Sequence, residues 1–169
     1  DIPVEQAKFF TLFTLMAMVA TYALGVILIP KYMNQAFALK ASAILGVLLS
    51  FCIVFTSGFT SVLFVAALGI ANALVWPAIW PLALTGMGKF TKTASALLIM
   101  AISGGAIIPP LYGALVDYKK ESLIVDGVSE LSAMAEAASF GYWILLPCYL
   151  IIFYYAFWGH NVGLKSITS

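Results

Sequence analysis

The sequence has no arginine, one histidine and two cysteines, and only 9% of its 169 residues are charged. A nucleic-acid surface needs clustered basic residues, so the net charge of +1 disfavours nucleic acid as a partner. Cys52 and Cys148 both fall in apolar stretches without metal-ligating neighbours. They are best interpreted as small apolar side chains rather than a disulfide or metal ligands. We therefore expect no metal and no cofactor.

Apolar residues are abundant instead: they make up 63% of the chain and give it a mean hydropathy of +1.07. Values this high are typical of a membrane protein. The uncharged run 41–88 would reach about 72 Å as a single helix, far more than the hydrocarbon thickness of about 30 Å, so it must turn. Residues 56–60 carry the turn-forming types. The sequence predicts an all-α membrane protein with five transmembrane helices, at about 9–29, 38–56, 61–84, 93–115 and 138–159.

The lysines are distributed unevenly between the two sides that five alternating spans define. One side receives no acidic residue and five lysines: Lys31, Lys40, Lys89, Lys92 and Lys165. The other side receives three lysines together with all seven acidic residues. The positive-inside rule places the first side, and with it the C-terminus, in the cytoplasm, so we expect a multi-pass protein of the inner (plasma) membrane.

The stretch 118–137 is the only long polar connection between the predicted spans. Its apolar residues follow a partly helical spacing, which is compatible with a short interfacial helix before the last span. A solvated acidic loop is the alternative interpretation.

The few ionisable groups disfavour catalysis and ion conduction. The central part of each predicted span is free of Asp, Glu, Lys and Arg, so no residue there can carry a proton through the bilayer. His160 lies at the opposite end of the spans from the carboxylates, so an acid and base pair would have to bridge the membrane. An enzyme is therefore not expected.

One polar and aromatic pattern interrupts the third predicted span. Asn72, Trp76 and Trp80 recur at every fourth residue, which places them along one helix face. Indole rings and an amide suit a pyranose, because its C–H face packs on aromatic rings and its hydroxyls need fixed hydrogen-bond partners. The alternative is structural, since tryptophan also marks membrane interfaces and asparagine also joins helices.

Helix-breaking residues accompany this pattern and recur in the fourth predicted span. Pro77 deprives the carbonyl of Ala73 of its helical donor, and Pro81 does the same to Pro77, which predicts a kink. The fourth span contains Ser103-Gly104-Gly105 followed by Pro109-Pro110, where a bend is also expected. Interrupted helices at the membrane midplane are common in transporter sites, whereas small residues alone also serve close helix packing.

The run ANALVWPAIWPLALTGMGKFTKTASALLIMAISGGAIIPPLYGALVD, residues 71–117, resembles the fucose:proton symporter family of the major facilitator superfamily, in particular its glucose/galactose transporter branch. The run YALGVILIPKYMNQAFALKASAILGVLL, residues 22–49, extends the similarity. The resemblance implies that residues 1–169 form the C-terminal half-domain, from the eighth to the twelfth helix, without the seventh helix and the N-terminal half. The start at Asp1, with neither methionine nor signal peptide, agrees with a fragment.

The resemblance also implies a function: a hexose, glucose or galactose, moved with protons by alternating access. Trp76 matches an aromatic position that faces the sugar. From the spacing along the helix face we add Asn72 as a residue that binds the sugar and Trp80 as one that gates or packs the same substrate-binding site. Pro77, Pro81, Ser103, Gly104, Gly105 and Pro109 would bend or gate the helices. Thr21-Tyr22 departs from a Gly-Arg pair of the fucose branch, which disfavours fucose, and the proton-coupling acids have no counterpart here. The alternative is a structural or assembly membrane domain, a half-transporter without transport activity.

Overall fold

The computed structural model describes residues 4–56 and 58–162, and over these residues it contains helices and no strand. Five helical stretches are long and apolar enough to cross a membrane: Phe9–Ile29, Gln35–Phe55, Gly58–Leu84, Gly88–Val125 and Glu130–Asn161. The prediction of an all-α membrane protein with five spans is therefore confirmed.

Interruptions divide the later spans into shorter elements. The α-helices are α1 (Val4–Lys31), α2 (Gln35–Phe55), α3 (Gly58–Ala73), α4 (Val75–Leu84), α5 (Thr91–Ala101), α6 (Gly104–Val125), α7 (Glu130–Gly141) and α8 (Leu145–Phe157). Single turns of 3₁₀ helix precede α5, join α7 to α8 and follow α8: Gly88–Phe90, Tyr142–Ile144 and Gly159–Asn161.

The turn between the second and third spans lies where the sequence predicts it. The helix α2 ends at Phe55, and α3 begins at Gly58, whose φ of +63° is a conformation that glycine adopts without steric cost. Ser57, which belongs to the same predicted turn, lies outside the described residues.

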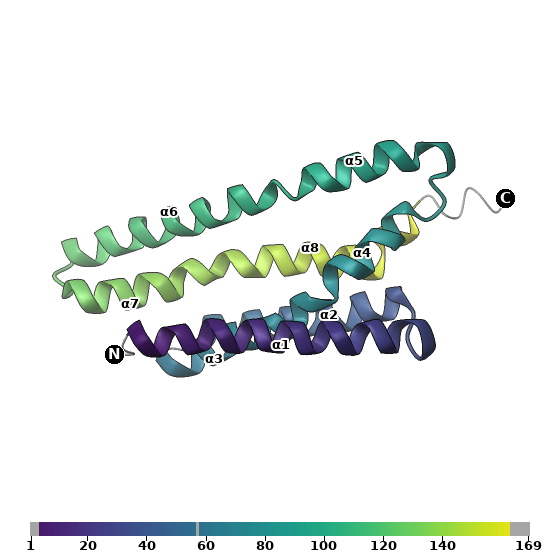
Figure 1. The fold of residues 1–169 in the computed structure, drawn as a ribbon. Coiled ribbons are helices and arrows are strands. Elements are labelled where there is room, and N and C mark those ends of the chain that lie inside the picture. The colour runs from purple at the N-terminus through teal and green to yellow at the C-terminus, as the bar shows by residue number, and fades with distance from the viewer. Residues whose placement is uncertain (1–3, 57, 163–169) are drawn as a thin grey trace.

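The polar stretch 118–137 is helical on both sides of a short turn rather than a loop, and it includes the short helix α7 (Glu130–Gly141) before the last part of the fifth span. The helix α6 continues to Val125, a short turn passes through Gly127 at φ +84°, and α7 runs in line with α8 (Figure 1). The side chain of Ser129 caps α7, and Lys120 Nζ lies 3.0 Å from Glu130 Oε1 across the turn. These local contacts hold α6 and α7 together at the turn, so the last two spans extend into a helical hairpin.

The ends of the helices form two groups. The α1–α2 turn and the α4–α5 turn lie at one end of the molecule, and the α6–α7 turn lies at the other (Figure 1). Lys31 and Lys89 belong to the first end, and the acidic residues of the hairpin belong to the second. This arrangement agrees with the alternation that the charge distribution requires.

The helix α2 lies at the centre of the packing and contacts α3, α4 and α8, while α1 packs on α3. Two clusters of buried residues form the core around α2. One consists of Leu39, Ala43, Ala78 and Ala156, and the other consists of Ile53, Leu68, Ala71 and Tyr149. Alanine predominates, which allows helices to approach closely in a bilayer, where apolar side chains gain little by leaving lipid.

Two glycines mark the closest contacts between helices. A Cβ atom placed on Gly69 of α3 would lie 2.6 Å from the backbone oxygen of Thr14 on α1. A Cβ atom on Gly46 of α2 would run into the ring of Tyr149 on α8. Glycine, whose side chain is a single hydrogen atom, is therefore required at both positions for α1 and α8 to pack this closely.

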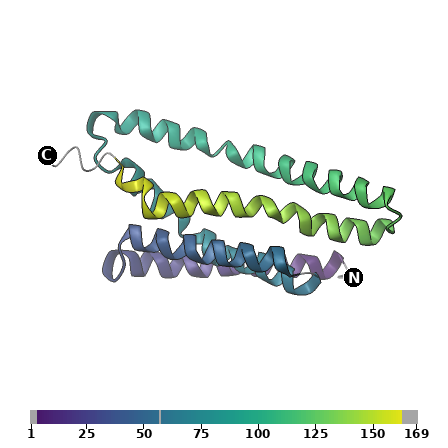
Figure 2. The same ribbon diagram turned by 180° about the vertical axis from the view of Figure 1, so that it is seen from behind.

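The fourth span lies apart from this packing. In both views α5 and α6 form one long rod along the side of the molecule that carries α7 and α8 (Figure 2). In the most apolar stretch of this span no residue is buried, whereas 39% of the residues in the most apolar stretch of α2 are buried. The rod is held at its two ends, by α4 and by α7.

Candidate functional site

The third span changes direction where proline removes a helical donor. The helix α3 ends at Ala73, and α4 resumes at Val75, one residue after Leu74. Pro77 has no N–H to offer the carbonyl of Ala73, and the regular pattern restarts with the bond from Ala78 N to Leu74 O at 3.1 Å. The result is that α4 leaves the axis of α3, as Figure 1 shows.

The two tryptophans of α4 lie side by side over a hollow in the surface. Their ring centroids are 5.5 Å apart at an interplanar angle of 51°, and Trp76 is 45% exposed. The hollow, here called the tryptophan groove, has a volume of about 450 Å³. It is lined by Tyr22, Trp76, Pro77, Trp80, Pro81 and Ile99. Residues of α1, α4 and α5 thus meet at this point.

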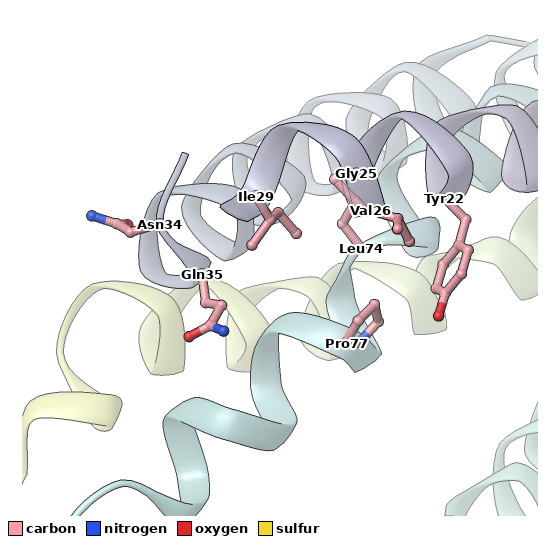
Figure 3. Close-up of a pocket in the computed structure, with 8 residues that line it drawn as sticks. All are labelled: Tyr22, Gly25, Val26, Ile29, Asn34, Gln35, Leu74 and Pro77. Carbon is pink, nitrogen blue, oxygen red and sulfur yellow. The ribbon is translucent and has the colours of Figure 1, made fainter. Parts of the chain in front are cut away.

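A second hollow adjoins the first along α1. This amide groove has a volume of about 490 Å³, within the range of about 300–1,000 Å³ that is usual for ligand pockets. It is lined by Tyr22, Gly25, Val26, Ile29, Asn34, Gln35, Leu74 and Pro77 (Figure 3). Tyr22 and Pro77 line both grooves. The two hollows are therefore neighbours, with the start of α4 between them.

Asn72 has different surroundings from the tryptophans. Its Oδ1 accepts a hydrogen bond of 2.7 Å from the hydroxyl of Tyr149 on α8, and it does not line either groove. The break at Leu74 explains the difference, because a spacing of four residues keeps side chains on one face only while the helix is continuous. The structure brings Trp76 and Trp80 together and leaves Asn72 directed to α8.

The predicted bend of the fourth span lies beyond these grooves. The helix α5 ends at Ala101, α6 begins at Gly104, and the hydroxyl of Ser103 donates to Met100 O at 2.6 Å. A side chain added at Gly104 or Gly105 would meet open space, and Pro109 is exposed. Ile99 lines the tryptophan groove and lies in the last turn of α5, directly before this interruption.

The sequence pattern used above misses one face of α1 and one residue of α8. Tyr22, Gly25, Val26 and Ile29 follow one helix face of α1, at intervals of three and four residues, and this spacing could have indicated a groove-lining face. Tyr149 could have been suspected only because a tyrosine in the middle of a span needs a partner for its hydroxyl.

The chemistry that these residues offer is hydrogen bonding and stacking. The grooves present indole rings, a phenol and amides, and no ionisable carboxylate, lysine or histidine lines them. Among the described residues no three His, Cys, Asp or Glu side chains come together as a metal site would require. Such a lining suits a neutral ligand that carries hydroxyl groups.

Fold and lining together define a multi-pass, all-α membrane protein with polar and aromatic grooves between its helices. Comparison with curated proteins narrows this class. The chain is 39% identical over 87 residues, 52% of its length, to a glucose/galactose transporter of Brucella abortus, of which the match covers 21%. It is 29% identical over 145 residues, 86% of its length, to a putative glucose/galactose transporter of Helicobacter pylori, of which 32% is covered.

A third relative is the L-fucose-proton symporter of Haemophilus influenzae, 29% identical over 127 residues, which are 75% of this chain and 27% of that protein. The chain thus spans between about a fifth and a third of the length of the curated relatives it matches. No protein-family profile and no solved structure matches it. The resemblance to the fucose:proton symporter family and its glucose/galactose transporter branch is confirmed by these relatives, which are transporters by name.

Proposed function

We propose that this chain is part of a secondary active transporter that moves a hexose, glucose or galactose, together with protons by alternating access. The observation that carries the proposal is the pair of tilted tryptophans over a groove on a bent membrane helix. The names of the relatives support sugar as the substrate class.

In this proposal the tryptophan groove receives the sugar ring. The exposed face of Trp76 packs against the C–H face of the pyranose, and Trp80 closes or packs the same surface. Asn72 contributes through its amide nitrogen, because its oxygen already accepts from Tyr149. Asn72 lines neither groove, so this contact belongs to a different point on the path of the sugar from the contact with Trp76 and Trp80.

The interruptions supply the movement that alternating access needs. Pro77 and Pro81 keep α4 at an angle to α3, and Ser103, Gly104, Gly105 and Pro109 allow α5 and α6 to bend relative to each other. The open space around Gly104 and Gly105 is available to a helix of another part of the transporter.

The remaining parts of the transporter lie outside these five spans. The central parts of the described spans contain no acidic or basic residue, so the coupled proton would be carried by residues of an N-terminal half that completes the cavity. We place the lysine-rich end and the C-terminus in the cytoplasm and the protein in the inner membrane. The sugar, the bilayer and that missing half would be its partners.

The decisive experiment measures hexose uptake by proteoliposomes that contain the full-length protein with these spans. Trp76→Ala should lower kcat/KM for glucose or galactose at least about tenfold, since loss of a stacked aromatic ring removes more than 1.4 kcal/mol. Trp143→Ala is the matched control, because Trp143 is 47% exposed but packs against Phe55 at the end of α2 and lines neither groove. Equal kinetics for Trp76→Ala and the unmutated protein would sink the assignment.

The structural alternative makes a different prediction for the same preparation. An assembly domain without transport activity would show no hexose uptake and no saturable change in tryptophan fluorescence when hexose is added. Saturable quenching that disappears in Trp76→Ala would favour the transporter.

A further inference from the structure

Tyr22 stands at the junction of the two grooves. It is a lining residue of both, together with Pro77, although the two residues come from different helices. A ligand that reaches across both hollows would therefore lie against the side chain of Tyr22 and the start of α4. A residue at such a junction contacts the ligand on either side.

The side chain of Tyr22 is equipped for this position. It projects from α1 toward α4 in Figure 3 and is 49% exposed. Its hydroxyl forms no hydrogen bond with any other described residue, unlike the hydroxyls of Tyr112 and Tyr149. A phenol in an apolar groove with an open donor and acceptor is available to a ligand hydroxyl.

Gln35 provides a second open polar group in the amide groove. Figure 3 shows its amide reaching into the space between α1 and α4, at the other end of the groove from Tyr22. Asn34 is different: its Oδ1 accepts from Phe37 N at 2.7 Å as the cap of α2, and its side chain points away from the groove. Gln35 and Tyr22 are thus the polar side chains with free hydrogen-bonding groups in this hollow.

We propose that Tyr22 and Gln35 form a second hydrogen-bonding site for a neutral, polyhydroxylated ring, adjoining the tryptophan groove on the side of the α1–α2 turn. The inference rests on the proposed function. The tryptophans bind the sugar by its apolar face and are indifferent to individual hydroxyls, whereas the phenol and the amide read particular hydroxyl positions. Tyr22 and Gln35 thereby determine which hexose is accepted, and they hold it after it leaves the tryptophans.

A set of monodeoxy-hexoses tests this division of roles in the full-length protein reconstituted in proteoliposomes. Tyr22→Phe should raise KM about three- to tenfold for hexoses that keep every hydroxyl, as expected for one neutral hydrogen bond. For the one deoxy-hexose that lacks the contacted hydroxyl, KM should be the same in Tyr22→Phe and the unmutated protein. Gln35→Met should show the same behaviour with a different deoxy-hexose. Trp76→Ala should weaken all the sugars alike.

Tyr118→Phe is the matched control, because Tyr118 is 73% exposed on α6 and lines neither groove. Unchanged KM values in both Tyr22→Phe and Gln35→Met, or an equal rise for every sugar including all deoxy-hexoses, would overturn the second site. If Trp76→Ala still impairs uptake in that case, the proposed function stands without it. Absence of hexose uptake by the unmutated protein would overturn both.

Discussion

At the scale of single residues, the close packing of the helices depends on glycines, which have no Cβ atom. Gly69 lets α3 lie against the backbone of α1 at Thr14, whose own hydroxyl donates to Phe10 O at 2.9 Å and so stays within its helix. Because the neighbour is backbone, it cannot rotate away from an added methyl group. A single methyl at this position must separate two helices.

We expect Gly69→Ala to lower the apparent melting temperature of the detergent-solubilised protein, because the new Cβ would meet Thr14 O and Cγ2 at 2.6 and 3.0 Å. Overpacking of this kind costs about 1–3 kcal/mol. Gly113→Ala in α6 is the control, since a Cβ there meets nothing within 4 Å. Equal melting temperatures for the two variants would contradict the close contact of α1 and α3.

Residue positions also show where sequence reasoning ends. Trp76 and Trp80 could be paired from their spacing because both belong to α4, and their rings lie together. Asn72 could not be placed, because the phase of the helix is lost at Leu74, and no pattern in the sequence states the angle at which α4 resumes. Tyr22 lines the tryptophan groove from α1; its spacing with Gly25, Val26 and Ile29 could indicate a lining face, but only the packing of α1 shows that this face meets α4.

At the scale of elements, the interruption gives the two halves of the third span different neighbours. The helix α3 packs against α1 and α2, whereas α4 packs against α2 through Ala78 and reaches the start of α5. The break therefore holds the tryptophans at the meeting point of three spans instead of within one packed pair. Its cause is the missing donor of Pro77.

Replacing Pro77 by Ala restores that donor, and we expect α3 and α4 to become more nearly continuous. Spin labels at positions 63 and 85, in a protein whose Cys52 and Cys148 are replaced by Ala, would then move toward the separation of about 33 Å that a straight helix gives. Pro81→Ala is the matched control, because Pro81 lies inside α4, after the break. Unchanged distances in Pro77→Ala would assign the bend to packing rather than to proline.

The existence of the five spans could be predicted because hydropathy and length are properties of the sequence itself. The hairpin of α6 and α7 could not be predicted, because the composition of the stretch 118–137 suits loop and helix alike. Its conformation depends on contacts between two helices, such as Lys119 Nζ with Glu136 Oε1 at 3.9 Å and the hydroxyl of Tyr112 with Ala138 O at 3.2 Å. Pairings of this kind appear only when α6 and α7 are placed side by side.

At the scale of the whole molecule, charge and topology agree on one orientation. The α4–α5 turn with Lys89 and the α6–α7 turn with Asp126 lie at opposite ends. The lysine-rich end belongs in the cytoplasm if the positive-inside rule holds for this chain.

Single cysteines at these two turns, introduced as Lys89→Cys and Asp126→Cys into a protein without Cys52 and Cys148, make the orientation measurable. Both positions are exposed, so reactivity reports on the side of the membrane and not on burial. A membrane-impermeant maleimide should label Asp126→Cys in intact cells and Lys89→Cys only after lysis. The reverse pattern would show that the protein is inserted the other way round.

The hairpin has a practical consequence for structure determination. The span Gly88–Val125 has 38 residues and so a helical length of about 57 Å, nearly twice the hydrocarbon thickness, and α7 lies beside its far end. A belt that covers about 30 Å of this length leaves several turns of helix outside it. The paired end of α6 and α7 would then offer an epitope for an antibody fragment, which adds the mass and asymmetry that particle alignment in electron cryomicroscopy requires.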